Sequence, residues 1–260
     1  MGAAQQQSLR VIITGASSGI GAALARRYAA AGATLGLIAR RRPGLEQLAG
    51  ELAVPHEIYP LDVRDGAAVA AAARAFVARH GCPDIVIASA GVSVGTAAGH
   101  AEDIAVFQEV LDINVMGAVK TLQPFIGCMR SRGSGALVGI ASVASYRGLP
   151  GAGAYSASKA ALVSALESLR VELRGSGIKV ITICPGYIAT PMTANNPYPM
   201  PFLMGADRAA EKITALIARG REFAVIPWQM AVIARLMRLL PNWLYDRLAA
   251  NRGRKPRRGS

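Results

Sequence analysis

Cysteine and histidine are scarce in this sequence, which limits the metal sites and disulfides that it can form. The chain of 260 residues has three histidines, all outside the motifs described below, and three cysteines, Cys82, Cys128 and Cys184. The cysteines are far apart, without a CxxC pair or the histidines that would complete a metal site, so we predict no metal site. We expect reduced, buried thiols in a cytosolic setting.

Long hydrophobic runs are also missing. The apolar stretch 224–234 has only eleven residues and contains Pro227, whereas about 20 are needed to span a bilayer. The first eight residues lack the apolar core of a signal peptide, and Gln6 stands where a myristoylation motif has Ser or Thr. We therefore expect a cytoplasmic protein that is neither exported nor acylated.

Acidic residues are few, and the excess positive charge lies at one end. The chain has 29 Lys and Arg against 16 Asp and Glu, a formal net charge of +13. The segment 235–260 holds eight of the basic residues and one acid, so the rest of the chain is only mildly basic. This distribution argues against nucleic-acid binding by the body of the protein.

Short apolar runs alternate with longer Ala-rich stretches, as in a parallel sheet covered by helices on both faces. The sequence predicts seven strands, over residues 9–14, 34–39, 57–61, 84–88, 136–142, 179–184 and 223–226. Predicted helices include residues 21–31, 67–80, 104–130 and 155–174. We expect a single-domain α/β fold, a Rossmann-type doubly wound parallel sheet, which binds its ligand at the carboxyl ends of the strands.

The first predicted strand runs into a glycine-rich turn, TGASSGIG, and then into a helix. Without a Cβ atom, glycine lets the backbone turn tightly and approach a pyrophosphate, whose charge then lies at the positive end of the helix. A glycine-rich turn that merely packs is the alternative interpretation. The strand-to-helix context favours dinucleotide binding by Gly15, Ser17, Ser18, Gly19, Ile20 and Gly21.

A second motif lies in the C-terminal half of the chain. Ser142 ends a predicted strand, and Tyr155 and Lys159 share one face of a predicted helix. An adjacent ammonium favours the ionised phenol, so we expect Lys159 to lower the pKa of Tyr155 and make it a usable general acid or base. An isolated YxxxK pair on a helix is usually solvated, and the motif gains weight only from its context.

These motifs together resemble the short-chain dehydrogenase/reductase family, with TGxxxGxG near the N-terminus and a serine thirteen residues before YxxxK. The resemblance covers roughly residues 8–227. It implies that Ser142 hydrogen-bonds the substrate oxygen, Tyr155 exchanges its proton, and Lys159 holds the nicotinamide ribose. Asn114, in DINVMG, matches the family's helix asparagine, which supports a proton relay through water to Lys159.

Further positions match the family at predicted strand ends. Asp62 and Val63 follow the third strand and resemble the adenine contact. The family's loop around the nicotinamide end is matched by Pro185, Gly186, Ile188 and Thr190. These positions lie where the sheet topology independently predicts a ligand.

After the fourth strand the chain departs from the family's Asn-Asn-Ala-Gly pattern. Ala90 and Gly91 keep its second half, whereas Ala88 and Ser89 replace the two asparagines. Ala88 lacks an amide that would tie neighbouring strands, so we expect altered stability more than lost activity.

Cofactor preference depends on the end of the second strand, where an NAD site places an acid on the ribose hydroxyls. This chain has Ala39 followed by three arginines. Arg40 can offer charge-assisted hydrogen bonds to a 2′-phosphate, so we predict NADP(H) in preference to NAD(H). The alternative is that these arginines are a solvated helix start, since the turn TGASSGIG holds no basic residue.

We assign residues 1–227 to the dinucleotide-binding catalytic domain. Within it, residues 190–206 hold four prolines and several large apolar side chains, and we predict an ordered substrate lid. An apolar lid favours a hydrophobic or lipid-like substrate. The apolar lid residues are Met192, Tyr198, Met200, Phe202, Leu203 and Met204.

Residues 228–260 are predicted to form an amphipathic helical extension, or two helices joined at Pro241, with a basic tail. Trp243, Tyr245 and the basic segment 252–258 suit an anionic membrane surface, which would make the protein peripheral to the inner face of a membrane. A helix that covers the substrate site or a subunit interface fits the sequence equally well.

The sequence therefore predicts an NAD(P)(H)-dependent oxidoreductase that moves a hydride between nicotinamide and a carbonyl or alcohol of a small molecule. We also expect a homodimer or homotetramer. Two other interpretations are a catalytically silent dinucleotide-binding sensor and a membrane-surface scaffold. The intact set of Asn114, Ser142, Tyr155 and Lys159 argues against the silent sensor.

Overall fold

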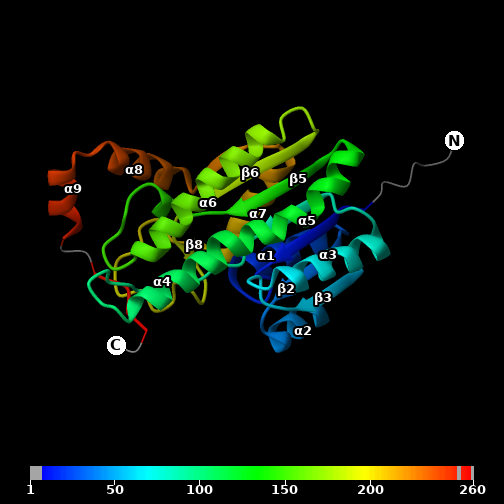
Figure 1. The fold of residues 1–260 in the computed structure, drawn as a ribbon, viewed down its shortest axis with the longest axis horizontal. Coiled ribbons are helices and arrows are strands. Elements are labelled where there is room, and N and C mark those ends of the chain that lie inside the picture. Colours follow the sequence, from blue (N-terminus) through cyan, green and yellow to red (C-terminus); the bar gives the residue numbers. More distant parts are fainter. Residues whose placement is uncertain (1–7, 251–252, 259–260) are drawn as a thin grey trace.

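A parallel sheet of seven strands forms the centre of the molecule, in a computed structural model that describes residues 8–250 and 253–258 (Figure 1). The strand order is β3-β2-β1-β4-β5-β6-β9. The strands are β1 (Arg10–Thr14), β2 (Thr34–Ala39), β3 (His56–Pro60), β4 (Ile85–Ala88), β5 (Gly135–Ile140), β6 (Ile178–Pro185) and β9 (Phe223–Ile226). The predicted doubly wound α/β fold is confirmed, and each strand lies within two residues of its predicted bounds.

Helices cover both faces of this sheet, because alternate strand residues point to opposite sides. On β1, Val11 and Ile13 belong to one apolar cluster and Ile12 belongs to the other. The first cluster holds α1 (Gly19–Ala30), α2 (Arg42–Gly50) and α7 (Ala206–Ala218). The second cluster holds α3 (Gly66–His80), α5 (Gly117–Arg132) and α6 (Gly153–Glu172).

The single helix predicted over 104–130 is three segments in the structure. They are α4 (Asp103–Leu111), a π-helical turn η1 (Asp112–Met116), and α5. Asn114 lies in this π-helical turn, a feature frequent at functional sites. The loop after β6 contains a short parallel pair, β7 (Ile188–Ala189) with β8 (Met204–Gly205), which closes the base of the predicted lid.

One buried hydroxyl joins the carboxyl ends of β1 and β4. Thr14 Oγ1 accepts hydrogen bonds from the backbone N–H groups of Ser89, at 3.1 Å, and Ala90, at 3.2 Å. Thr14 Oγ1 also lies 3.5 Å from the Ile87 carbonyl. These bonds connect the strand ends at the position where Ala88 lacks an amide.

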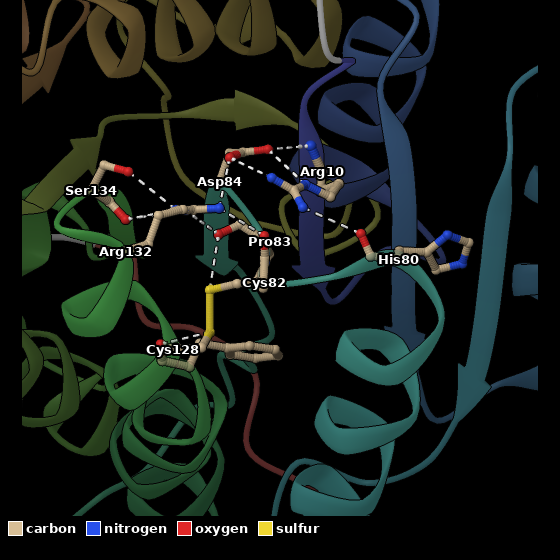
Figure 2. Close-up of polar contacts among 9 residues, drawn as sticks. Arg10, His80, Cys82, Pro83, Asp84, Cys128, Arg132 and Ser134 are labelled. Atoms are coloured by element: carbon tan, nitrogen blue, oxygen red, sulfur yellow. Dashed lines mark hydrogen bonds and ion pairs between the residues drawn. A yellow bond between two sulfur atoms is a disulfide. The ribbon is translucent and has the colours of Figure 1, made fainter.

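A disulfide joins Cys82 and Cys128, whose Cα atoms are 5.8 Å apart, so the expectation of three reduced thiols is wrong for this pair. Only Cys184 is a buried free thiol, as expected. Figure 2 shows the polar network around the disulfide, at the amino ends of β1 and β4. There Asp84 pairs with Arg10 at 3.2 Å and with Arg132 at 2.9 Å. The two cysteines are 46 residues apart, and packing of α5 beside β4 brings them together.

The C-terminal extension forms two helices, α8 (Trp228–Leu239) and α9 (Asn242–Ala249), with Pro241 between them. The chain then returns toward the start of α4, as Figure 1 shows. Residues 253–258 lie there, whereas residues 1–7 and Arg252, which the sequence interpretation also used, lie outside the described residues. Within the described ranges, no helix is both long enough and apolar enough to cross a membrane.

We predict that Thr14→Val lowers the free energy of unfolding by about 1–3 kcal/mol, because two partly buried N–H groups lose their acceptor. Thr121→Val is the matched control, since the Thr121 hydroxyl is buried but only donates to the Gly117 carbonyl of its own helix. Urea unfolding of both variants measures the difference. Equal destabilisation by the two substitutions would contradict this role of Thr14.

Candidate active site

A cavity of about 450 Å³ runs along the carboxyl ends of the central strands. It brings together every residue that the sequence assigned to a dinucleotide. These residues are Gly15, Ser17, Ser18, Gly19, Ile20, Gly21, Arg40, Asp62, Val63, Ala90, Gly91, Tyr155, Lys159, Pro185, Gly186, Ile188 and Thr190. We call this space the nucleotide cleft.

Only glycine fits at the turn that forms the floor of this cleft. Gly15 has φ of +70°, and a Cβ atom there would lie 2.9 Å from both the N and Cα atoms of Ala90. A Cβ atom on Gly21 would meet the Gly15 carbonyl. Helix α1 begins at this turn with no acid in its first turn, so its positive end is left for an anion. The turn therefore fits a pyrophosphate.

Two arginines line the far end of the nucleotide cleft, after β2. Arg40 lies 3.8 Å from the Asp62 carboxylate, and the Arg41 guanidinium donates to Ser18 Oγ at 3.5 Å. The turn TGASSGIG itself holds no basic residue, but Arg41 places a guanidinium group beside it. The only sequence signal for it was its place in the run of three arginines.

Ser142, Tyr155 and Lys159 converge at the other end of the nucleotide cleft. Ser142 follows β5, and its Oγ accepts from the Ala144 N–H at 3.1 Å. Tyr155 stands in the first turn of α6, and the Lys159 ammonium lies 5.7 Å from the centre of its ring. Lys159 Nζ is buried and donates to the Ile140 carbonyl at 2.8 Å.

The protonation of Tyr155 differs from the sequence expectation. Burial raises the pKa of Tyr155 above its ordinary value, and a hydrogen bond with Ser142 opposes this. Burial lowers the pKa of Lys159 to about 8, because the charged ammonium loses hydration. The Lys159 ammonium donates to the Ile140 carbonyl, and desolvation is the largest influence on the pKa of the Tyr155 phenol. The Tyr155 phenol is consequently protonated at neutral pH.

Asn114 is fully buried and held from three directions. Its Oδ1 accepts from the Val92 N–H at 2.8 Å, and its Nδ2 donates to the Val92 carbonyl and to Ser158 Oγ, both at 2.9 Å. A Cβ atom on Gly91 would lie 3.2 Å from Asn114 Oδ1 and 3.6 Å from Lys159 Nζ. Asn114 and Lys159 therefore flank Gly91, and Ser158, which no sequence signal indicated, orients the asparagine amide.

A second cavity, of about 630 Å³, adjoins the nucleotide cleft, and Ser142, Tyr155 and Gly186 line both. We call it the substrate cavity. The predicted lid lines it with Met192, Tyr198 and Met200. Other lid residues point elsewhere: Phe202 and Leu203 are exposed, and Met204 is buried in the core. Gly253 and Lys255, from the basic tail, also line this cavity, although the sequence had assigned the tail no single position.

Known proteins resemble this chain in sequence and in fold. A family model described as short chain dehydrogenase matches residues 10–199. An uncharacterized oxidoreductase of Myxococcus xanthus is 42% identical over 241 residues, which cover 92% of this chain and 95% of that protein. A short-chain dehydrogenase structure from Streptomyces avermitilis gives a TM-score of 0.79 at 26% identity, covering 88% of this chain and 92% of that one.

A further solved structure carries a ligand. It is an alcohol dehydrogenase from Thermococcus sibiricus complexed with 5-hydroxy-NADP, with a TM-score of 0.75 at 27% identity, and the match covers 84% of this chain and 95% of that one. Both solved structures share the fold of this chain. The chain is an oxidoreductase of the short-chain dehydrogenase/reductase family.

Proposed function

We propose that this protein reduces the carbonyl group of apolar, lipid-like molecules with NADPH, and that the same residues serve the reverse oxidation of an alcohol. One observation carries the proposal: the nucleotide cleft and the substrate cavity meet at Ser142 and Tyr155. A proton donor at that junction can reach a substrate oxygen while a nicotinamide lies on the other side.

In this proposal each residue has a separate task. When bound, the nicotinamide supplies the hydride for reduction and takes it up in oxidation. Ser142 hydrogen-bonds the substrate oxygen and Tyr155 gives it a proton, which agrees with the raised pKa of the Tyr155 phenol. Lys159 holds the nicotinamide ribose, and Asn114 orients water that returns the proton to Tyr155 by way of Lys159.

The preference for NADP(H) is supported by the cationic end of the nucleotide cleft. No acid follows β2, and both Arg40 and Arg41 line the cleft there. Asp62, across the cleft, pairs with Arg64 at 2.8 Å. Two guanidinium groups can form charge-assisted, bidentate hydrogen bonds to a 2′-phosphate.

The lipid-like substrate is supported by the lining of the substrate cavity, to which the lid contributes Met192, Tyr198, Pro199, Met200 and Pro201. Burial of apolar surface contributes about 25 cal/mol per Å², which favours a hydrocarbon chain over a sugar. We assign this chemistry to the catalytic domain, residues 1–227, and membrane or subunit contact to the helices α8 and α9 of the extension 228–260.

The extension carries an exposed apolar stripe that suits a membrane surface. Trp228, Leu239 and Trp243 are 71%, 79% and 68% exposed, respectively, and Leu236 is 59% exposed. Arg235, Arg238 and Arg247 add positive charge to the same two helices. We propose that a cytoplasmic pool of the protein binds the inner face of an anionic membrane through this stripe.

We also propose a homo-oligomer, a dimer or tetramer. Its support is a second exposed apolar set, Ile104, Met116 and Val119, along α4, η1 and α5. This set lies on different helices from the stripe on α8 and α9.

We predict that Tyr155→Phe lowers turnover at least ~100-fold and leaves NADPH affinity unchanged, because it removes only the proton donor. Tyr146→Phe is the matched control, since Tyr146 is a nearby, partly buried tyrosine that lines neither cavity. Turnover is measured on ketones of increasing chain length, and NADPH binding by quenching of its fluorescence. Turnover of Tyr155→Phe close to that of the native protein would refute the assignment.

We predict that Arg40→Ala and Arg41→Ala each lower kcat/KM for NADPH about tenfold relative to NADH, because each removes a charged partner of the 2′-phosphate. Arg42→Ala controls for net charge, since Arg42 pairs with Glu46 and does not line the cleft. An NADPH to NADH ratio unchanged in the first two variants, or equally changed in all three, would contradict the NADP(H) assignment.

We predict that the protein sediments with anionic phosphatidylglycerol vesicles at low salt and is released at high salt. The double variant Trp228→Ser, Trp243→Ser should sediment several-fold less, whereas Val171→Ser, which alters an exposed apolar residue on α6, should not. If the native protein does not sediment, the stripe belongs to a subunit interface, and the mass in solution should then fall in the double variant.

A further inference from the structure

The last described residues, 253–258, contribute Gly253 and Lys255 to the lining of the substrate cavity and are held by contacts with other segments; we call them the C-terminal strap. The Gly95 N–H donates to the Pro256 carbonyl at 3.1 Å. The Arg257 guanidinium pairs with Asp103 at 2.8 Å and with Glu102 at 2.9 Å. These contacts fasten the strap to α4 and to the segment after β4, so its position at the cavity is set by specific partners.

Lys255 is the one charged residue, among the described residues, that lines the substrate cavity. Its ammonium donates to the Met192 carbonyl of the lid at 3.3 Å. An ammonium has three donors, so this bond leaves capacity for a further acceptor. Burial lowers the pKa of Lys255 because its charge is partly desolvated. Within that same described lining, no carboxylate faces it.

A partly desolvated cation in an apolar cavity gains most from an anionic partner, since hydrogen bonds between two ionised groups are stronger than those between neutral groups. The same cavity contains Ser142 and Tyr155. One molecule can therefore present its carbonyl to the hydroxyl pair, its hydrocarbon body to the lid methionines, and an acidic group to Lys255.

We propose that Lys255 binds an anionic group of the substrate, a carboxylate or a phosphate, and that the substrates are consequently acidic amphiphiles such as long-chain oxo acids. This rests on the proposed reductase function for the carbonyl end. The anion site itself depends only on the position of Lys255. Lys255 also has a structural role, because it donates a hydrogen bond to the Met192 carbonyl. An experiment must distinguish this role from substrate binding.

Binding of non-reducible probes tests the anion site without turnover. Calorimetry of the full-length protein compares decanoate, decyl phosphate and methyl decanoate, which share one hydrocarbon chain. Lys255→Gln keeps an amide donor for Met192 but removes the charge, and should weaken the better-bound anion about tenfold relative to methyl decanoate. Lys255→Arg should restore that preference, and Arg254→Gln, which removes the neighbouring exposed charge outside the cavity, should not alter it.

Turnover provides the second measurement, with 5-oxodecanoate and its methyl ester as ketones. The ratio of kcat/KM for the acid to that for the ester should fall about tenfold in Lys255→Gln, through KM more than kcat. If Lys255 binds a phosphate and not a carboxylate, Lys255→Gln should weaken the binding of decyl phosphate and leave that of decanoate unchanged.

Each outcome separates the two proposals. Three results would overturn the anion site and leave the reductase proposal standing. They are an equal loss of kcat/KM for the acid and the ester in Lys255→Gln, an equal loss of anion affinity in Arg254→Gln, and an affinity for both anions that does not depend on Lys255. Lys255-dependent anion binding in a protein that reduces no ketone would sustain the anion site and overturn the reductase proposal.

Discussion

The close contact between Gly15 and the backbone of Ala90 is the constraint on which both cavities depend. A Cβ atom at Gly15 would lie 2.9 Å from two Ala90 backbone atoms, so β1 and β4 can meet at this distance only with glycine there. The Thr14 hydroxyl holds the same two strand ends by accepting from Ser89 and Ala90. Beyond this junction the chain turns to α1 on one face and toward α4 and α5 on the other, which opens the nucleotide cleft.

Desolvation is the main influence on the pKa of both ionisable side chains at the other end of the cleft. It raises the pKa of Tyr155 and lowers that of Lys159 to about 8, so at neutral pH the phenol keeps its proton and the ammonium is close to losing one. A protonated Tyr155 phenol can donate a proton, and the Lys159 ammonium can pass a proton on to the phenol. The same burial requires that polar partners be fixed, and Ser158, Val92 and Ile140 supply them.

Much of this arrangement was predictable from the sequence, for a physical reason. Strands buried on both faces are continuous apolar runs, so their bounds emerged within two residues. The nucleotide residues follow strand ends, and parallel topology brings those ends to one edge. The glycine-rich turn and the Tyr155/Lys159 pair could be recognised from the sequence, because each needs particular residue types at a fixed spacing.

The remaining features depend on contacts that a local pattern does not contain. The Cys82–Cys128 disulfide needs α5 to pack beside β4, across 46 residues. The π-helical turn at Asn114 inserts into an otherwise helical pattern, and the direction of the Tyr155 pKa depends on burial. The segment that carries Lys255 is held by Gly95, Glu102 and Asp103, which are far away in the sequence.

The central claim, that this site transfers a hydride to a carbonyl carbon, is tested most directly by following the hydrogen itself. NADPH labelled with deuterium on one or the other face of C4 is incubated with the protein and with 5-oxodecanoate or 2-decanone, and the alcohol product is analysed by mass spectrometry. The account predicts one deuterium at the carbinol carbon from one labelled form and none from the other, because a fixed nucleotide cleft presents a single face to the substrate cavity. Unlabelled alcohol from both forms, or no alcohol from either ketone, would contradict it.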